Sequence, residues 1–348
     1  MAQVAALNAG LGQVYSDIDG LLMSTLVVDD YVDLEKLKIN QVVHPPFVPG
    51  SLANPAPPLP PLVYPPEPQF APPPAPTGLA AAFGGERRHT DWVAQRRAAH
   101  EAVHYAWHQH CLQLHATYLA HSAARQQAEN ERLRLLEQAQ ATYTQDCRER
   151  ETKAAEHDRQ LTSLINELAF DVESAIQEYV SIVLSNSVYP EAFPVSHSQE
   201  FDIVSRELRI SVAVPGPKEI PMIEEYRYVK SRDEIATVEV SLKEQKARYA
   251  SAVWQVALRT LHEIFEADRA AKIKSIELAV STYTIAPATG LSMAVPLAIV
   301  AAERAIFTTF DLSNVVPIAT LEHLGAALSP EPFDLVPADT TAGVKRRG

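Results

Sequence analysis

The second half of the chain alternates short β-type runs with one long helical pattern. Apolar residues recur at helical spacing from Ser241 to about Ala271, and Ser241 with Glu244 forms a capping box at the predicted start. A short helix is predicted over Val315–Leu324, with Gly325 as its C-cap. Runs rich in β-branched residues predict strands at Phe201–Val204, Leu208–Val214, Glu225–Val229, Ile235–Val240, Ile273–Ile285 and Leu291–Val300. This order predicts an α+β domain whose mainly antiparallel sheet packs on the long helix.

From Glu86 to about Ser185 the pattern is that of a long helix. The stretch contains neither proline nor glycine and consists mainly of Ala, Gln, Glu, Arg, His and Leu. Its apolar positions are sparse and only loosely heptad: Trp92, Val103, Trp107, Leu114, Leu119, Leu133, Leu136, Tyr143, Leu161, Leu164, Leu168 and Val172. Because so polar a helix cannot bury its apolar stripe alone, it needs a partner from its own chain or from another. A coiled-coil dimer or an antiparallel helical hairpin follows, and the pattern does not choose between them.

The first 43 residues predict a small ordered element. Its helical spacing is carried by Leu7, Leu11, Val14 and Ile18. Residues 25–39 mix β-branched and acidic side chains, and we predict a short strand followed by a turn at Asp29-Asp30. The acidic cluster lacks the glycine and the terminal glutamate of a calcium-binding loop, so a solvated turn is predicted rather than a metal site. The cluster consists of Asp29, Asp30, Asp33 and Glu35.

Proline dominates the next segment, since residues 44–77 hold 15 of the chain's 26 prolines. This density predicts extended polyproline II without a core of its own. It acts either as a semi-rigid spacer or as a ligand for an aromatic groove on a partner. The chain thus divides into a small N-terminal element (1–43), a Pro-rich linker (44–85), a long helical or coiled-coil region (86–187), an α+β domain (188–340) and a basic tail (341–348).

Charge and cysteine content narrow the function classes. The net charge of −13 disfavours non-specific binding to nucleic acid, and the basic clusters Arg87/Arg88 with Arg96/Arg97 and Lys345–Arg347 are short. Cys111 and Cys147 would lie roughly 54 Å apart on one straight helix, so no disulfide between them is expected. No signal peptide is evident, and the apolar run Leu291–Ala302 is shorter than the roughly 20 residues that span a bilayer. A cytoplasmic protein without membrane contact is predicted.

Three groups of polar residues invite chemical interpretations. His100, His104 and His108, followed by Cys111 and His115, share one helix face and have ligand types that zinc prefers, but we favour a solvated or seam-lining face. The pairs His262/Glu266 and Arg259/Glu263 fit acid–base chemistry, yet surface ion pairing is the simpler prediction. Glu244-Gln245-Lys246 has the letters of a nuclease E-x-K motif but falls in the first turns of a predicted helix rather than on a strand.

Several segments in order along the chain resemble a known family. They are IDGLLMSTLVVDDYVDLEKLK, HPPF, PPPAPTGLAAAFGG, SVYPEAFP, EEYRYVKSRDEI, YASAVWQVALRTLHEIFEADRA and DLSNVVPIATLEHLGAALSPEPFDLVP. Together they are similar to the non-catalytic N-terminal region of bacterial, actinobacterial-type Mrr-like restriction endonuclease proteins. The resemblance implies a Pro-rich linker, a coiled coil and an α+β domain, followed in the family by a nuclease domain that cuts foreign or modified DNA. The chain stops at Gly348, where that domain would begin, and carries none of its motifs.

We therefore expect no catalytic residue, no cofactor-binding residue and no metal ligand, and we expect that this chain is not itself an enzyme. The resemblance implies a regulatory, oligomerising or target-sensing part of an Mrr-type DNA defence system. Its expected partners are a second copy, bound through the long helix, and a nuclease domain or protein. DNA is a partner that the charge disfavours. The alternative is a coiled-coil scaffold or interaction protein unrelated to nucleic acid.

Overall fold

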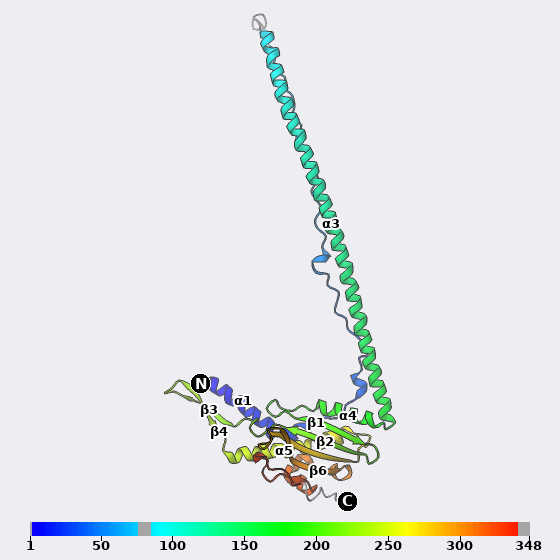
Figure 1. Ribbon diagram of the computed structural model, residues 1–348, viewed down its shortest axis with the longest axis vertical. Coiled ribbons are helices and arrows are strands. Elements are labelled where there is room, and N and C mark those ends of the chain that lie inside the picture. The colour runs from blue at the N-terminus through cyan, green and yellow to red at the C-terminus, as the bar shows by residue number, and fades with distance from the viewer. Residues whose placement is uncertain (1, 76–84, 340–348) are drawn as a thin grey trace. The chain divides into compact units, whose positions relative to one another are not determined.

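A computed structural model describes residues 2–75 and 85–339 (Figure 1). The remaining positions of the predicted linker and the predicted basic tail, 341–348, lie outside the described residues. The chain divides into two compact units, Met1–Ile39 with Glu156–Gly348, and Asn40–Ala155. The residues predicted as a small N-terminal element thus belong, up to Ile39, to the same unit as the α+β domain.

The larger unit is built on a five-stranded sheet, which confirms the predicted α+β class. In sheet order its strands are β1 (Ser196–Asp202), β2 (Glu207–Val214), β5 (Ser275–Ile285), β6 (Ser292–Glu303) and β7 (Ala327–Leu328). All neighbours are antiparallel except β2 and β5, which are parallel. The parallel pair arises because the chain leaves the sheet after β2 and returns through a helical crossover. The crossover contains the hairpin β3 (Ile223–Val229) and β4 (Glu234–Glu239), then α5 (Leu242–Ala267).

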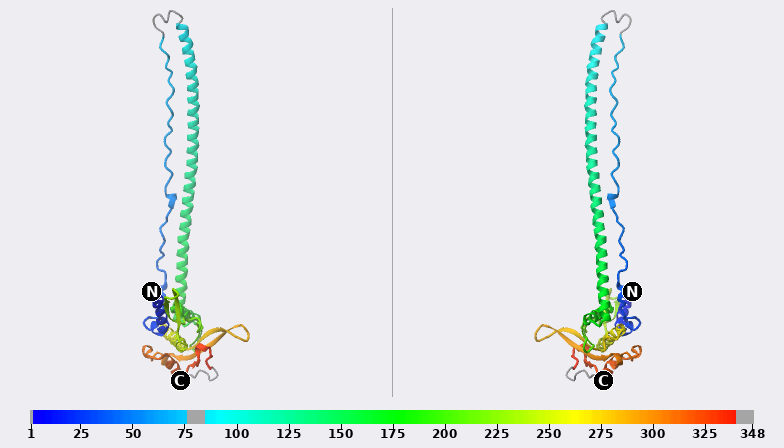
Figure 2. Two further views of the ribbon diagram at one scale, coloured as in Figure 1. Left: turned by 90° about the vertical axis from the view of Figure 1, so that its left-hand side faces the viewer. Right: turned by 90° about the vertical axis from the view of Figure 1, so that its right-hand side faces the viewer.

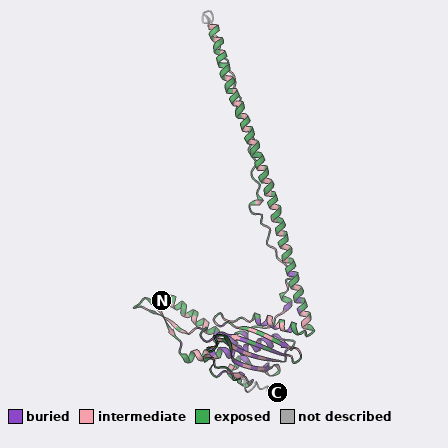
Figure 3. Ribbon diagram, in the orientation of Figure 1, coloured by how far each residue is buried: buried purple, intermediate pink, exposed green. Residues whose placement is uncertain are grey.

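Helix α5 is the centre of the core. Ser241 caps it as predicted: its hydroxyl accepts the backbone N–H of Glu244 at 3.3 Å and donates to the Glu244 carboxylate at 2.6 Å. One side of α5 packs on β5 and β6, and its other sides contact α1, α2, α4 and α7. Every position from Ala252 to Leu261 is therefore buried. Figure 3 shows buried positions gathered around the sheet of this unit. Its fully buried side chains include Tyr249, Leu258, Leu261 and Ile264.

Short helices complete this unit. Their bounds are α1 (Ala2–Asp19), α2 (Leu21–Thr25), α4 (Glu173–Asn186), α6 (Arg304–Phe307) and α7 (Pro317–His323), with 3-10 turns η1 (Leu34–Leu37), η4 (Leu312–Asn314) and η5 (Pro332–Asp334). Asn8 of α1 is hydrogen-bonded to both backbone groups of Tyr226 on β3. Gly325 has φ of 76° just beyond α7, the left-handed position predicted for a C-cap.

The strand predicted within residues 25–39 is wrong. This segment is irregular and ends in η1, and side chains of neighbouring helices satisfy its backbone N–H groups. Asp30 N donates to Glu266, Val32 N donates to the Tyr179 hydroxyl at 3.3 Å, and Ile39 N donates to Asp158 at 2.7 Å. Since these partners occupy the donors that a strand ladder would use, β-branched composition does not produce a strand here.

The long helical region is one continuous helix followed by a short one. Helix α3 runs from Glu86 to Ala169, so no hairpin forms within it. It ends where Asp171 adopts φ of 55°, and Val172 N donates back to Glu167 O at 3.0 Å. Such a left-handed residue closes a helix end, and α4 then begins in a new direction.

In the unit Asn40–Ala155, the Pro-rich segment lies along α3. We call residues 44–70 the proline strap; it is extended except for η2 (Gly50–Ala53) and follows the helix in the opposite direction (Figure 2). Polyproline II makes no internal hydrogen bonds, so its carbonyls accept from helix side chains. Trp107 donates to Pro65 O at 3.0 Å, Arg125 to Ala56 O at 3.0 Å and Tyr143 to Pro45 O at 2.9 Å. The segment predicted as a spacer or as a ligand for another protein therefore packs along a helix of its own chain.

Candidate functional site

Arg259 and Glu263 form a buried ion pair on α5, so the prediction of surface pairing is wrong for these two residues. Their side chains are 5% and 1% exposed, and Nε of Arg259 donates to Oε1 of Glu263 at 2.7 Å. The prediction failed because α5 is covered on several sides, whereas an amphipathic pattern leaves one side in solvent. The guanidinium also donates to four further oxygens: Leu21 O, Ser24 Oγ, Ser187 Oγ and Val188 O. Its Cζ lies 4.2 Å from the centre of the Tyr189 ring.

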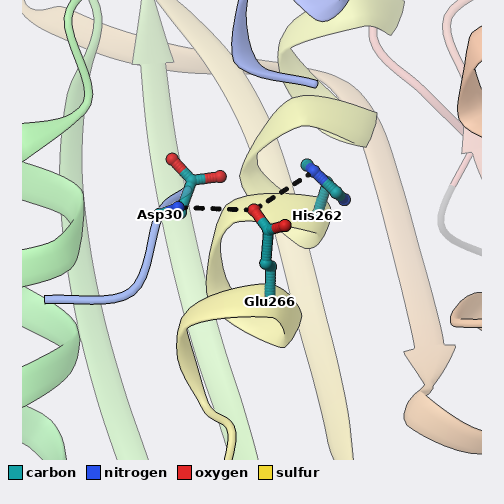
Figure 4. A group of neighbouring side chains, drawn as sticks. All are labelled: Asp30, His262 and Glu266. Atoms are coloured by element: carbon teal, nitrogen blue, oxygen red, sulfur yellow. Dashed lines mark hydrogen bonds and ion pairs between the residues drawn. The ribbon is translucent and has the colours of Figure 1, made fainter. Parts of the chain in front are cut away.

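One turn further along α5, a histidine and two carboxylates come together. Asp30, His262 and Glu266 each offer one ligand atom, and these atoms all lie within 4.8 Å of one another. His262 and Glu266 are one helical turn apart on α5, and Asp30 reaches them from the irregular segment after α2 (Figure 4). The Glu266 carboxylate lies 3.6 Å from His262 Nε2 and accepts the Asp30 backbone N–H at 3.4 Å. We call these three residues the Asp–His–Glu group.

The Asp–His–Glu group borders a surface cleft. His262 and Glu266 line this cleft of about 360 Å³ together with aromatic side chains and polar groups of the β6–α7 connection. The remaining lining residues include Phe265, Phe307, Phe310, Asp311 and Ser313. A cleft of this size, apolar with a few convergent polar groups, is typical of a small-ligand site.

Burial shapes the electrostatics of the group. Removal from water, reinforced by the neighbouring Glu263 and Glu266 carboxylates, raises the pKa of Asp30 to about 7, and Arg259 opposes this only in part. Burial also lowers the pKa of His262, although Glu266 and Glu263 act in the other direction. The imidazole is therefore held in its neutral form, which is the form that coordinates metal ions.

Because the pKa of Asp30 is raised, the stability of the fold should depend on pH. The measurement is made with a chelator present, so that the carboxyl is studied without bound metal. Its carboxyl has a pKa of 3.8 when unperturbed and about 7 in the fold, so between these values the folded state binds more protons than the unfolded state. The contribution of Asp30 to stability therefore falls as pH rises through this window. Thermal melts of Asp30→Asn and wild type should show the variant gaining in relative stability with pH. A constant difference across the window would contradict the assignment.

Three of the five residues on the His-rich face of α3 have partners in the proline strap. His100, His104 and His115 contact the proline strap at Pro68 O, Glu67 and Tyr64, at 3.1, 3.0 and 2.7 Å. The sequence predicted a solvated or seam-lining face, and the contacts observed are with the proline strap rather than with a second helix. Cys111 and Cys147 are free thiols, as expected. Glu244-Gln245-Lys246 lies in the first turns of α5, where Lys246 pairs with Glu331 and Asp334 at 3.4 and 2.6 Å.

The acidic residues predicted to form one solvated turn have different environments in the structure. Asp29 is exposed and pairs with Arg269 at 2.6 Å, and Asp33 caps η1. Asp30 instead turns inward to α5 and is half-buried, so for this residue the prediction is wrong. The spacing of His262 and Glu266 was visible in the sequence, but nothing local could connect it with Asp30.

Comparisons with protein-family models, with curated proteins and with solved structures find no match for this chain. Within residues 2–75 and 85–339, no helix combines the length and the apolar character needed to cross a membrane.

Proposed function

We propose that this chain is the self-associating, non-catalytic part of an Mrr-type DNA defence system in the cytoplasm, and that two copies associate through α3. The segments that resemble Mrr-like proteins support the choice of system. The observation that supports self-association is an apolar row on α3 that the proline strap leaves exposed. We call this row the α3 seam.

The α3 seam has a heptad repeat. Tyr105, Leu112, Leu119 and Leu133 are spaced by seven residues or a multiple of seven, and they are 67%, 52%, 55% and 49% exposed. Exposed alanines precede two of them by three residues, at 102 and 116, and the heptad position between Leu119 and Leu133 is Gln126. Alternating alanine and larger apolar residues at such positions suits close packing of two helices. Since successive residues turn by roughly 100°, the strap-binding residues Trp107, Arg125 and Tyr143 are rotated from the nearest seam residues by roughly 160°, 120° and 80°, so they lie outside the seam.

Two faces of α3, one that binds the strap and one proposed to bind a second copy, account for its composition. The strap supplies a partner for one face through hydrogen bonds to carbonyls, so that face can be rich in His, Arg and Tyr. The α3 seam supplies the apolar face that a second copy would cover. A dimer would bring two α+β domains, and any nuclease associated with each, into one assembly, as a two-strand cut in DNA requires.

The first test is the mass of the chain in solution. Wild type should have the mass of two chains by light scattering, and the double variant Leu112→Glu/Leu119→Glu should have the mass of one, because four carboxylates would be buried in the interface. The matched control, Thr117→Glu/Ala124→Glu, places the same charges on the same helix away from the α3 seam and should stay dimeric. A monomeric wild type, or equal masses for both variants, contradicts self-association through the seam.

A second test addresses the system itself. Purified chain is mixed with an Mrr-type nuclease domain, and cleavage of methylated and unmethylated plasmid DNA is measured. Wild type and the control variant should alter the rate or the selectivity of cleavage, and the seam variant should have less effect. A dimeric chain with no effect on cleavage and no nuclease among its bound proteins would instead support the scaffold alternative.

A further inference from the structure

We propose that the Asp–His–Glu group binds one divalent transition-metal ion, with Asp30, His262 and Glu266 as its protein ligands. The proposal is independent of self-association, because all three residues lie in the unit that contains the α+β domain. It concerns a site that the sequence alone did not predict.

The first argument is geometric. Metal ions such as Zn²⁺ bind imidazole nitrogen and carboxylate oxygen at roughly 2.0–2.2 Å, so the ligand atoms of one tetrahedral ion lie roughly 3.4 Å apart. The three ligand atoms are already gathered within 4.8 Å. The His262–Glu266 pair, at 3.6 Å, already has nearly this spacing, and side-chain rotations that shift the remaining ligand atoms by about an ångström would complete the site. A ligand pair one turn apart on α5 gives the site a rigid base, and Asp30 supplies the third ligand from outside the helix.

The second argument is the unbalanced charge of the site. In the part of the chain that the structure describes, no lysine or arginine forms an ion pair with Asp30 or Glu266. Arg259 is engaged by Glu263, and Arg269 by Asp29. When both are ionised, these two carboxylates repel each other without a lysine or arginine to offset them, and a bound divalent ion would neutralise both.

The third argument is an unpartnered oxygen beside the group. Oε2 of Glu263 is buried and makes no hydrogen bond to any residue that the structure describes. The Thr25 hydroxyl lies 3.0 Å from Oε1 of Glu263 and 3.4 Å from Oδ2 of Asp30, so the two carboxylates share one neighbour. Glu263 would thus lie behind the ligands, where a carboxylate commonly orients the groups that coordinate a metal ion.

The donor set selects the class of ion. Imidazole nitrogen suits zinc, iron, cobalt, nickel and copper, whereas magnesium and calcium prefer oxygen alone. Three protein ligands leave at least one coordination position for water or another small ligand. Because His262 and Glu266 also line the cleft beside Phe307 and Asp311, that position would be accessible from the cleft.

The test uses the full chain, stripped of metal with a chelator and dialysed. Zn²⁺, Mn²⁺, Co²⁺ and Mg²⁺ are titrated separately by calorimetry, with Co²⁺ also followed by its visible absorption. We expect one transition-metal site per chain and a higher melting temperature with metal. Asp30→Asn, His262→Gln and Glu266→Gln should each weaken binding by at least roughly tenfold.

Two variants serve as controls. Asp29→Asn removes the adjacent exposed carboxylate, and His108→Gln removes a histidine of the α3 face, so both should bind metal as wild type does. Asp30→Asn keeps the shape of the side chain, so it tests the site even if His262→Gln does not fold. The proposal is overturned if no transition-metal ion binds, if the three ligand variants bind like the controls, or if Mg²⁺ binds as tightly as Zn²⁺.

Discussion

Replacement of Arg259 by leucine should lower the free energy of unfolding of the α+β unit by about 3–5 kcal/mol, a large fraction of the roughly 5–15 kcal/mol that stabilises a typical domain. The guanidinium is the only charged partner of the Glu263 carboxylate among the described residues, and the carboxylate is 1% exposed. Without it, a buried charge would remain unpaired, Val188 O would lose its donor, and Leu21 O would keep only the Ser24 hydroxyl. Urea denaturation followed by the fluorescence of the buried Trp254, with Trp92 and Trp107 replaced by phenylalanine, measures the change.

Two further variants test whether the loss of stability comes from the unpaired Glu263 carboxylate. Arg259→Leu/Glu263→Leu removes both charges and should recover much of the loss, because an apolar pair needs no compensating charge. Arg232→Leu removes the exposed partner of Glu234, whose pair is 75% and 50% exposed, and should cost no more than about 1 kcal/mol. If Arg259→Leu is no more harmful than Arg232→Leu, the buried pair does not hold the unit together.

Much of the fold was predictable because its signals are local. The capping box at Ser241 and Glu244 marked the start of α5. Strands that follow each other in the sequence form the antiparallel pairs β1–β2, β3–β4 and β5–β6, although β1 begins at Ser196 rather than at the predicted Phe201. In each case, residues close in sequence both form the element and terminate it, so a short window contains the information.

Features that depend on distant partners were not predictable. Asp171 ends α3 without a glycine or proline to announce it, and its left-handed backbone is stabilised by hydrogen bonds of the finished turn. The proline strap resembles a spacer until Trp107, Arg125 and Tyr143 are seen to donate to its carbonyls. Carbonyl acceptors exist in every residue, so sequence letters do not reveal such a contact.

The Asp–His–Glu group was not predicted from the sequence for the same reason. The spacing of His262 and Glu266 indicated only that two polar side chains share a face, which is common on solvated helices. Asp30 contributes because α2 packs against α5 and carries the following segment to that face. A pattern of acidic residues after α2 could not show which of Asp29 and Asp30 points inward.

Replacement of Asp268 by alanine should destabilise the same unit by roughly 2–4 kcal/mol. Asp268 follows α5 and is 8% exposed. Its carboxylate accepts the backbone N–H groups of Lys272 at 3.0 Å and Ile273 at 2.8 Å, and it pairs with Arg304. Alanine would leave two backbone donors without their acceptor and the half-buried guanidinium without its counter-charge.

Asp268 therefore ties the end of α5 to the start of β5 and to α6, the junction that sets how the helix meets the sheet. Burial lowers the pKa of Arg304, and the Asp268 carboxylate opposes that effect, so the pair depends on both members. The urea midpoint of Asp268→Ala should fall clearly, and Asp268→Asn, which keeps one acceptor oxygen, should fall less. Asp311→Ala, which removes an exposed carboxylate that caps η4, is the matched control and should change the midpoint little. Equal midpoints for Asp268→Ala and Asp311→Ala would show that the junction does not rely on this carboxylate.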